Sequence, residues 1–184
     1  MAVRRRPVIG VMGAGERASA RDRALALRLG ERLAERGWIV LTGGRPCGVM
    51  AAANRGAKRV PGSLTVGILP SAAGPVGADV DVAVFTGLGN ARNAINVLSS
   101  CVVVACGAGG PGTASEVALA LKSGKPVVLV AAPAAACAYF ATLGGDLVFL
   151  DSADEAVAAV GDAIARQRAR RGRGGFARRR RELR

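Results

Sequence analysis

The sequence predicts an α/β protein built on a doubly wound parallel sheet with helices on both faces. Short apolar runs alternate along the chain with runs of good helix formers, which is the order typical of βαβ units. Hydrophobic residues make up 51% of the 184 residues, but aromatic residues only 3%. The core must therefore be aliphatic, as in a parallel sheet that is buried on both faces. Because the length suits one domain, we expect a single Rossmann-like domain.

The expected elements follow from these runs and from the helical period. The short apolar runs predict strands near Val8–Met12, Ile39–Leu41, Thr65–Leu69, Val80–Phe85, Val102–Ala105, Val127–Val130 and Leu147–Leu150. Helices are expected near Ser19–Arg36, Gly48–Lys58, Ala91–Ser99, Thr113–Lys122 and Asp154–Arg168, and a further short one near Ala135–Leu143 is left undecided by the pattern. Ser152 and Glu155 have the spacing of a capping box ahead of the last helix.

The most informative segment is the glycine-rich turn that follows the run Val102–Ala105. Gly107, Gly109, Gly110 and Gly112 lie within six residues, whereas a plain strand–helix connection needs only one or two glycines. Such a turn leaves backbone N–H groups unbonded at the positive end of a helix dipole. The segment therefore predicts a phosphate site.

Glu116 lies one turn into the helix that follows this glycine-rich segment. Its carboxylate would then lie beside whatever the loop holds. Thr113 and Glu116 also have the spacing of a capping box, in which each side chain bonds to the other's backbone N–H. The pattern leaves both interpretations open.

Two further glycine-rich turns follow earlier strands. One contains Gly43, Gly44 and Gly48, and the other contains Gly13 and Gly15. The pattern Gly-x-x-Gly-x-Gly around the latter is not the dinucleotide fingerprint, and no acidic residue follows the second strand, so NAD binding of the usual kind is not expected. All three turns converge on one edge of the predicted sheet, where open α/β folds bind ligands.

The absence of histidine narrows the possible chemistry. A chain without histidine cannot form a Ser–His–Asp or Cys–His pair or a histidine-ligated zinc site, and no metal site is expected. The basic start, Arg4 to Arg6, precedes an apolar stretch that breaks at Gly13, which is too short for a signal peptide. No run approaches the ~20 apolar residues of a membrane span, so we expect a cytoplasmic protein with no membrane partner.

The net charge of +13 is concentrated at one end of the chain. Residues 166–184 contain ten arginines and one acidic residue, Glu182, so they contribute +9 and leave +4 for residues 1–165. We expect residues 1–165 to form the nucleotide- or phosphate-binding domain and residues 166–184 to be an Arg-rich, disordered tail. The tail either attracts nucleic acid non-specifically or serves solubility alone.

Four segments together resemble the LOG superfamily, long called "lysine decarboxylase-like". The resemblance covers roughly residues 7–165. The run from Arg92 to Ser100 looks most like the branch that contains the molybdenum cofactor carrier proteins. The segments are Gly43-Gly44 with Gly48 and Met50, Arg92 to Ser100, Gly109 to Glu116, and Gly124 to Val128.

The phosphoribohydrolases of this superfamily cleave the bond between base and ribose in nucleoside 5′-monophosphates. The resemblance assigns the assisting arginine and glutamate of those enzymes to Arg92 and Glu116. It assigns the phosphate cradle to Gly109, Gly110, Gly112 and Thr113. Ala108 stands where the hydrolases have proline, and the stretch between Arg92 and the loop carries one extra residue. Such a shift could displace Arg92 relative to Glu116 and weaken catalysis.

In the carrier branch the same loops are thought to bind the phosphate of a pterin cofactor without turning it over. We therefore expect a carrier or binding protein for a small phosphorylated ligand, either the molybdenum cofactor or a nucleoside monophosphate, with no further cofactor required. The alternative is a phosphoribohydrolase acting on a purine nucleoside 5′-monophosphate, and the third is nucleic-acid binding through the tail. The expected ligand-binding residues are Gly13, Gly15, Gly43, Gly44, Gly48, Arg92, Asn93, Gly109, Gly110, Gly112, Thr113 and Glu116.

The predicted helix Ala91–Ser99 also bears on the oligomeric state. It carries Ala94, Ile95, Val97 and Leu98 over most of its circumference, and a helix that is apolar all round is buried on more than one side. We expect a homodimer or a higher homo-oligomer with this helix and the helix Thr113–Lys122 near the two-fold axis, as the resemblance also implies.

Overall fold

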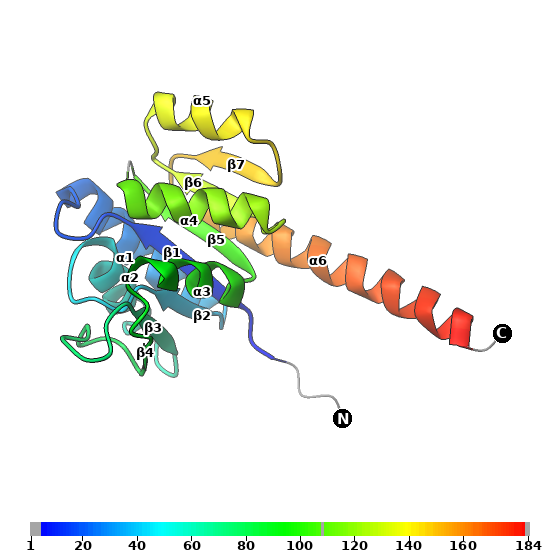
Figure 1. Ribbon diagram of the computed structural model, residues 1–184, viewed down its shortest axis with the longest axis horizontal. Coiled ribbons are helices and arrows are strands. Elements are labelled where there is room, and N and C mark those ends of the chain that lie inside the picture. Colours follow the sequence, from blue (N-terminus) through cyan, green and yellow to red (C-terminus); the bar gives the residue numbers. More distant parts are fainter. Residues whose placement is uncertain (1–4, 108, 183–184) are drawn as a thin grey trace.

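A computed structural model describes residues 5–107 and 109–182. It contains one seven-stranded sheet in the order β4-β3-β2-β1-β5-β6-β7 (Figure 1). Every pair of neighbouring strands is parallel, so the predicted doubly wound parallel sheet is confirmed. The strands are β1 (Val8–Gly13), β2 (Ile39–Thr42), β3 (Thr65–Leu69), β4 (Val82–Phe85), β5 (Val102–Cys106), β6 (Val127–Val130) and β7 (Leu147–Leu150).

Helices cover both faces of the sheet. Buried residues of α1, α2 and α6 form one apolar cluster with one side of the central strands, and residues of α3, α4 and α5 form a second cluster with the other side. The segment that the sequence left undecided is helical, as α5. The helices are α1 (Ala20–Glu35), α2 (Gly48–Ala57), α3 (Arg92–Ser99), α4 (Pro111–Lys122), α5 (Ala134–Thr142) and α6 (Ala153–Glu182), and a 3₁₀ turn, η1 (Gly89–Ala91), precedes α3.

Strands β5 and β6 are buried throughout, whereas the edge strand β4 is exposed. All five residues of β5 and all four of β6 are buried, which explains their unbroken runs of apolar residues. The connection from β3 to β4 contains no helix, so the residues of β4 remain accessible. This connection lies against the turn after β2, where the Gly77 N–H donates to the Gly44 carbonyl over 2.9 Å.

The last helix is longer than the sequence predicts. α6 continues to Glu182, so it passes through the expected boundary at residue 165 and takes in most of the segment expected to be disordered. Alanine, arginine and glutamine are good helix formers, and they outnumber the three glycines of this segment. The capping box of Ser152 and Glu155 is confirmed, because each side chain bonds to the backbone N–H of the other residue. Ala108, Leu183 and Arg184 lie outside the described residues.

The strand order places a crevice beside β1. The neighbours of β1 are β2 and β5. Strands β2 to β4 are therefore added on one side of β1, and strands β5 to β7 on the other. The loops that follow β1 and β5 therefore diverge, and open α/β sheets bind ligands at such a switch point. Among the described residues no helix is both long and apolar enough to cross a membrane.

Candidate functional site

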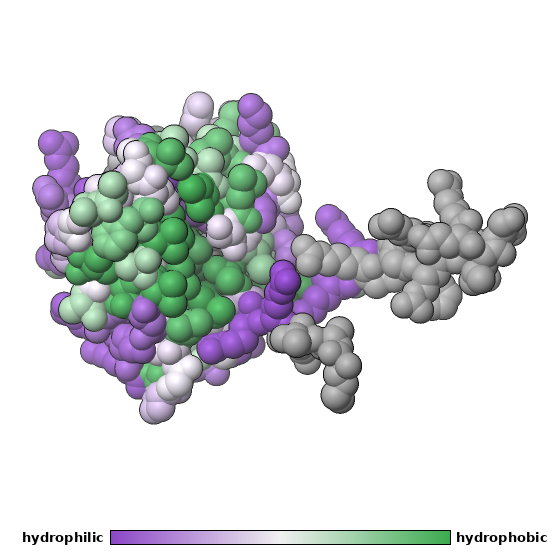
Figure 2. Space-filling view, turned by 60° about the horizontal axis from the view of Figure 1, so that its bottom comes forward, coloured by the Kyte–Doolittle hydropathy of each residue, from purple (hydrophilic) through white to green (hydrophobic). Residues whose placement is uncertain are grey.

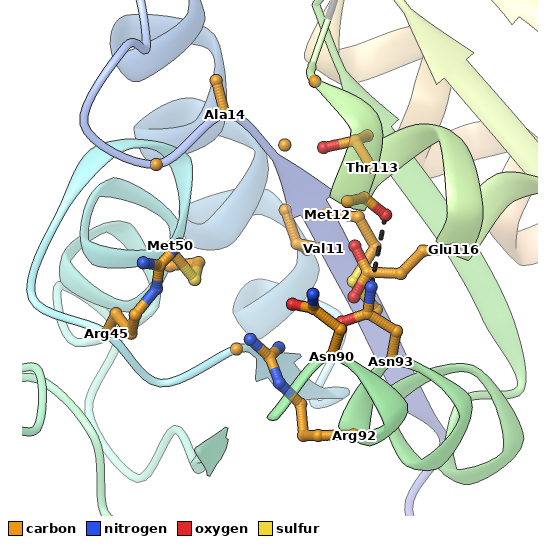
Figure 3. A pocket seen from close by; sticks show the side chains of 15 residues that line it. Val11, Met12, Ala14, Arg45, Met50, Asn90, Arg92, Asn93, Thr113 and Glu116 are labelled. Carbon is orange, nitrogen blue, oxygen red and sulfur yellow. Dashed lines mark hydrogen bonds between the residues drawn. The ribbon is translucent and has the colours of Figure 1, made fainter. Parts of the chain in front are cut away.

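A pocket of about 170 Å³ lies at the switch point (Figure 3). Residues from the ends of β1 and β2, from the starts of α3 and α4 and from α2 surround it. Figure 3 shows Arg45 and Met50 on one side, Thr113 and Glu116 on the other, and Arg92 between them. The lining residues are Val11, Met12, Gly13, Ala14, Gly15, Gly43, Arg45, Met50, Asn90, Arg92, Asn93, Gly110, Gly112, Thr113 and Glu116.

The turn between β2 and α2 brings Arg45 to the pocket. The buried Thr42 hydroxyl oxygen accepts hydrogen bonds from the Gly44 N–H and from Asn54 Nδ2, both over 3.1 Å. Gly44 has a φ of +72°, and a Cβ on it would lie 3.0 Å from the Cα of Gly67. The turn is therefore fixed by a side-chain bond and by close packing on β3. It carries Arg45 across to the β1 loop, where its Nη2 lies 3.0 Å from the position that a Cβ on Gly15 would take.

Arg92 enters the pocket from the first residue of α3. Its side chain is only 8% exposed, and Nη1 lies 2.5 Å from where a Cβ on Gly43 would be. Glycine at position 43 thus makes room for the guanidinium. Within the described residues, the buried Nε of Arg92 has no hydrogen-bond partner.

The N-terminus of α4 lacks a side-chain cap. The helix begins at Pro111, and its N-cap is Gly110. Proline suits the first position because its φ is already helical and its missing N–H has no helical partner there. The N–H groups of the first turn, which include Gly112 and Thr113, have no intrahelical partners and face the pocket edge.

The capping box of Thr113 and Glu116 is therefore not formed, and that interpretation is wrong. The early start at Pro111 makes Thr113 the third residue of the helix rather than its cap. Glu116 falls in the second turn, 6% exposed. Its Oε1 accepts a 2.7 Å hydrogen bond from Asn96 Nδ2 of α3.

A second bond joins the same two helices, because Asn93 Nδ2 donates to the Ser115 hydroxyl oxygen over 2.9 Å. These two bonds fix α3 and α4 side by side. They hold Arg92 and Glu116 at one pocket without an ion pair between them, since no Arg92–Glu116 pair lies within 4.0 Å.

The electrostatics of the pocket favour an anionic ligand. Burial raises the pKa of the Glu116 carboxyl, although the bond from Asn96 and the charge of Arg92 oppose the rise. Burial also lowers the pKa of Arg92, the charge of Arg45 lowers it further, and Glu116 opposes both. In the described part of the chain neither arginine has a carboxylate within 4.0 Å. Two guanidinium groups and a helix N-terminus thus face one carboxyl group whose ionisation is disfavoured.

Most of the residues predicted from the sequence meet at this pocket. Gly44, Gly48 and Gly109 do not line it, because they shape the surrounding turns: a Cβ on Gly48 would collide with the carbonyl oxygens of Ala14 and Gly15. A Cβ on Gly109 would collide with the Thr113 side chain. Those that line it are Gly13, Gly15, Gly43, Arg92, Asn93, Gly110, Gly112, Thr113 and Glu116.

Sequence reasoning missed three polar residues at the site. Arg45 and Asn90 line the pocket, and Asn96 holds Glu116. Asn96 lies in the run that carries the family resemblance, and Arg45 directly follows Gly43-Gly44. Both residues could therefore have been found from segments that the sequence already pointed to. In residues 5–107 and 109–182, no three Cys, Asp or Glu side chains gather in a way that could hold a metal ion.

Comparison with known proteins places the chain in a family. The model of the SLOG cluster4 family matches residues 6–157. The chain belongs to this SLOG family. A protein of Archaeoglobus fulgidus is 44% identical over 125 residues, which is 68% of this chain and 80% of that protein.

Two solved structures resemble this SLOG protein along nearly their whole length. The molybdenum cofactor binding protein from the phototrophic bacterium Rippkaea orientalis is 49% identical, with a TM-score of 0.82 over 87% of this chain and 98% of that one. The molybdenum cofactor carrier protein from Chlamydomonas reinhardtii is 46% identical, with a TM-score of 0.83 over 88% of this chain and 99% of that one. The resemblance to the LOG superfamily and to its carrier branch is confirmed.

Proposed function

We propose that this protein binds and carries a phosphate-bearing pterin of the molybdenum cofactor type, held by its phosphate at the N-terminus of α4. One observation carries the proposal most: Arg92 is only 8% exposed, its charge lies near that of Arg45, and no carboxylate of the described residues lies within 4.0 Å of it. A buried charge without a counter-charge is costly. A bound dianion would supply that counter-charge and would also satisfy the uncapped helix.

The residues present suit the phosphate end of such a ligand. The first-turn N–H groups of α4 would donate to phosphate oxygens, and Arg92 and Arg45 would neutralise them. The pocket, at about 170 Å³, is smaller than the ~300–1,000 Å³ of sites that enclose a drug-sized ligand. The phosphate and its neighbouring atoms would therefore lie inside, and the rest of the pterin would lie at the pocket's open side. The bound cofactor would supply the molybdenum and the redox chemistry of the metal. This chain would only hold and orient the cofactor.

The relatives support this assignment. Two proteins that are 46–49% identical over nearly all of their length are molybdenum cofactor binding or carrier proteins. A test is to incubate the protein with cofactor freed from a molybdoenzyme, pass it through a desalting column and measure the retained pterin by fluorescence after oxidation. We expect retention by the unchanged protein and by Arg55→Ala, and loss in Arg45→Ala. Arg55 is an exposed residue of α2 that does not line the pocket. Equal retention by all three proteins would contradict the role given to the phosphate site.

A phosphoribohydrolase is the second candidate, because Glu116 and Arg92 line the same pocket. If the protein hydrolyses nucleotides, incubation with AMP releases adenine, and Glu116→Gln stops the release while AMP stays bound. If it is a carrier, AMP is bound and stays intact over hours. Chromatography of the supernatant separates the two outcomes. We favour the carrier because Ala108 replaces the proline of the hydrolase loop and because the Arg92 segment carries an extra residue.

We also propose that two copies of the chain pair through α3 and α4. Figure 2 brings forward the lower side of Figure 1, which carries α3 and β4, and shows a broad hydrophobic area there with a hydrophilic border. A cavity of about 500 Å³ along α3 and α4 is lined by Ala91, Ala94, Pro111 and Leu119 among others, and Leu98 is 61% exposed.

Sedimentation velocity at micromolar concentration tests this pairing. We expect a dimer for the unchanged protein and a monomer for Leu98→Glu. Leu143→Glu, at a residue of which 46% is exposed at the end of α5, should remain dimeric. A monomeric unchanged protein would rule the interface out.

A further inference from the structure

The end of the molecule opposite the phosphate pocket holds a second, strongly basic cleft. It encloses about 720 Å³ between the N-terminal segment, the ends of α3 and α4 and the middle of α6. None of the described residues that line it is acidic. Figure 1 shows the N-terminal segment and the projecting part of α6 at this end, away from the loops that follow β1 and β5. Its five cationic residues are Arg5, Arg6, Lys125, Arg168 and Arg170.

Backbone carbonyls, rather than carboxylates, hold two of the cations of this cleft. Lys125 Nζ donates to the Ser100 carbonyl over 2.7 Å and to the Leu98 carbonyl over 3.1 Å. Arg6 Nε donates to the Gly37 carbonyl over 2.7 Å. Across the described residues, none of the five has a carboxylate within 4.0 Å. Their positive charge is therefore not compensated by a neighbouring carboxylate.

Elsewhere on the described surface some arginines are paired with acids, whereas others, such as Arg17 and Arg21, have no carboxylate within 4.0 Å. Arg32 contacts both Glu35 and Asp154 over 2.6 Å, and Arg166 contacts Asp146 over 3.1 Å. The basic cleft differs in that five cations line one hollow and none of its described lining residues is acidic. This grouping favours a binding surface over a general contribution to solubility.

α6 continues beyond the cleft, and its sequence there is rich in arginine. The helix is buried at Val160 and Ala163 but exposed from Arg168 to Arg170, and it continues to Glu182. Between residues 166 and 182 the sequence holds nine arginines and one glutamate. At a rise of 1.5 Å per residue, this is about one net positive charge for every 3 Å of helix.

We propose that the basic cleft and α6 together bind the phosphate backbone of a nucleic-acid duplex. A duplex carries about one negative charge per 1.7 Å of axis, roughly twice the density of positive charge along this part of α6. A membrane-binding helix needs an apolar face, and the segment from 166 to 182 contains only Ala169, Phe176 and Ala177 as apolar residues besides glycine. The described lining of the cleft contains no aromatic side chain on which unpaired bases could stack. Binding is therefore directed at phosphates and is independent of sequence.

The two sites lie at opposite ends of the strands, so each can be filled while the other is occupied. The phosphate pocket lies where the strands end, and the basic cleft begins at Arg5 to Val8, where β1 starts. Loss of ligand binding at α4 should leave duplex binding unchanged. This separates the present inference from the proposed carrier function.

Fluorescence anisotropy with the full chain and labelled duplexes of about 20 base pairs, one of DNA and one of RNA, tests the proposal. We expect micromolar or tighter binding at about 50 mM salt, with the logarithm of the binding constant falling by about 0.9 per contacted phosphate on a logarithmic salt axis. The double variant Arg168→Ala, Arg170→Ala should reduce that slope by about 2. A difference between the DNA and RNA arms identifies the type of duplex.

A matched variant, Arg17→Ala with Arg21→Ala, controls for net charge. It removes two exposed arginines from the opposite end of the molecule, where the β1 loop and α1 lie, and should leave the slope unchanged. An equal loss in both double variants would overturn the proposal, as would an absence of duplex binding at low salt. Tighter binding to poly-glutamate or to phosphatidylserine vesicles than to either duplex would also overturn it.

Discussion

The pattern Ser/Thr-x-x-Glu occurs at the start of two helices, and the two copies behave differently. Ahead of α6, Ser152 and Glu155 form a capping box on an exposed surface. At α4, Thr113 and Glu116 have the same spacing but form no cap, because Pro111 starts the helix two residues before Thr113. Instead, the Glu116 carboxyl group accepts a hydrogen bond from Asn96. The same local pattern thus caps α6 but leaves the N-terminus of α4 without a side-chain cap.

Blocking the open end should have the largest effect. Gly110 has extended backbone, and a Cβ on it would meet nothing within 4 Å, so Gly110→Val should fold normally. Its side chain would lie over the first-turn N–H groups of α4 and should weaken binding of a phosphorylated ligand by about 100-fold, which is about 2.7 kcal/mol. Calorimetric titration with AMP measures the loss, and far-UV circular dichroism checks the fold.

The control is Ala114→Val, an exposed position of the same helix that does not line the pocket. It should bind AMP as the unchanged protein does. Unaltered affinity in Gly110→Val would show that the ligand does not use this helix end.

Removing the carboxyl group of Glu116 should destabilise the fold. In Glu116→Ala the buried Asn96 Nδ2 loses its oxygen acceptor and keeps only a weak contact with Met12 Sδ at 4.0 Å, and an unsatisfied buried group costs about 1–3 kcal/mol. Glu116→Gln keeps an oxygen acceptor and should lose much less. Urea unfolding at neutral pH compares the two variants, and similar stabilities would mean that the bond from Asn96 contributes little.

The two Ser/Thr-x-x-Glu patterns can be compared directly by removing each hydroxyl. Ser152→Ala should lower the free energy of unfolding by about 0.5–2 kcal/mol, the usual contribution of an N-cap. Thr113→Ala should show no such capping loss, because Thr113 does not cap α4. Thermal unfolding of both variants checks this, and an equal loss at the two positions would restore the capping interpretation of Glu116.

The smallest expected effect is a pH dependence. Burial raises the pKa of Glu116 in the folded protein above its ordinary value of 4.5. Its contribution to stability is therefore fully present below pH 4.5 and is lost as the pH rises through the raised pKa. Glu116→Gln cannot ionise, so its unfolding free energy relative to the unchanged protein should increase over that range. Urea unfolding across a pH series tests the sign, and a constant difference would indicate an unshifted carboxyl.

The sequence predicts the elements of the fold well because their signals are local. Apolar runs such as Val102–Ala105 and Val127–Val130 lie within one residue of the observed strands. The glycine-rich turns after β1, β2 and β5 place Gly13, Gly43 and Gly110 at one pocket, since parallel strands end on a common side of the sheet.

The remaining features depend on contacts between distant segments. Arg45 reaches the pocket only because Thr42 and the packing on Gly67 fix its turn. The partner of Glu116 lies 20 residues away on α3, so a capping pattern alone could not reveal it. Gly44 and Gly48 look like ligand-binding glycines in the sequence, but their neighbours in space show that they allow close backbone packing.

Native mass spectrometry of freshly purified protein tests the central claim most directly. The unchanged protein, produced in cells that make the molybdenum cofactor, should carry an additional mass that fragments to a phosphate-bearing pterin. The Gly110→Val protein purified in parallel should carry none. A ligand-free unchanged protein, or the same ligand on both proteins, would contradict the claim that the open end of α4 holds the phosphate.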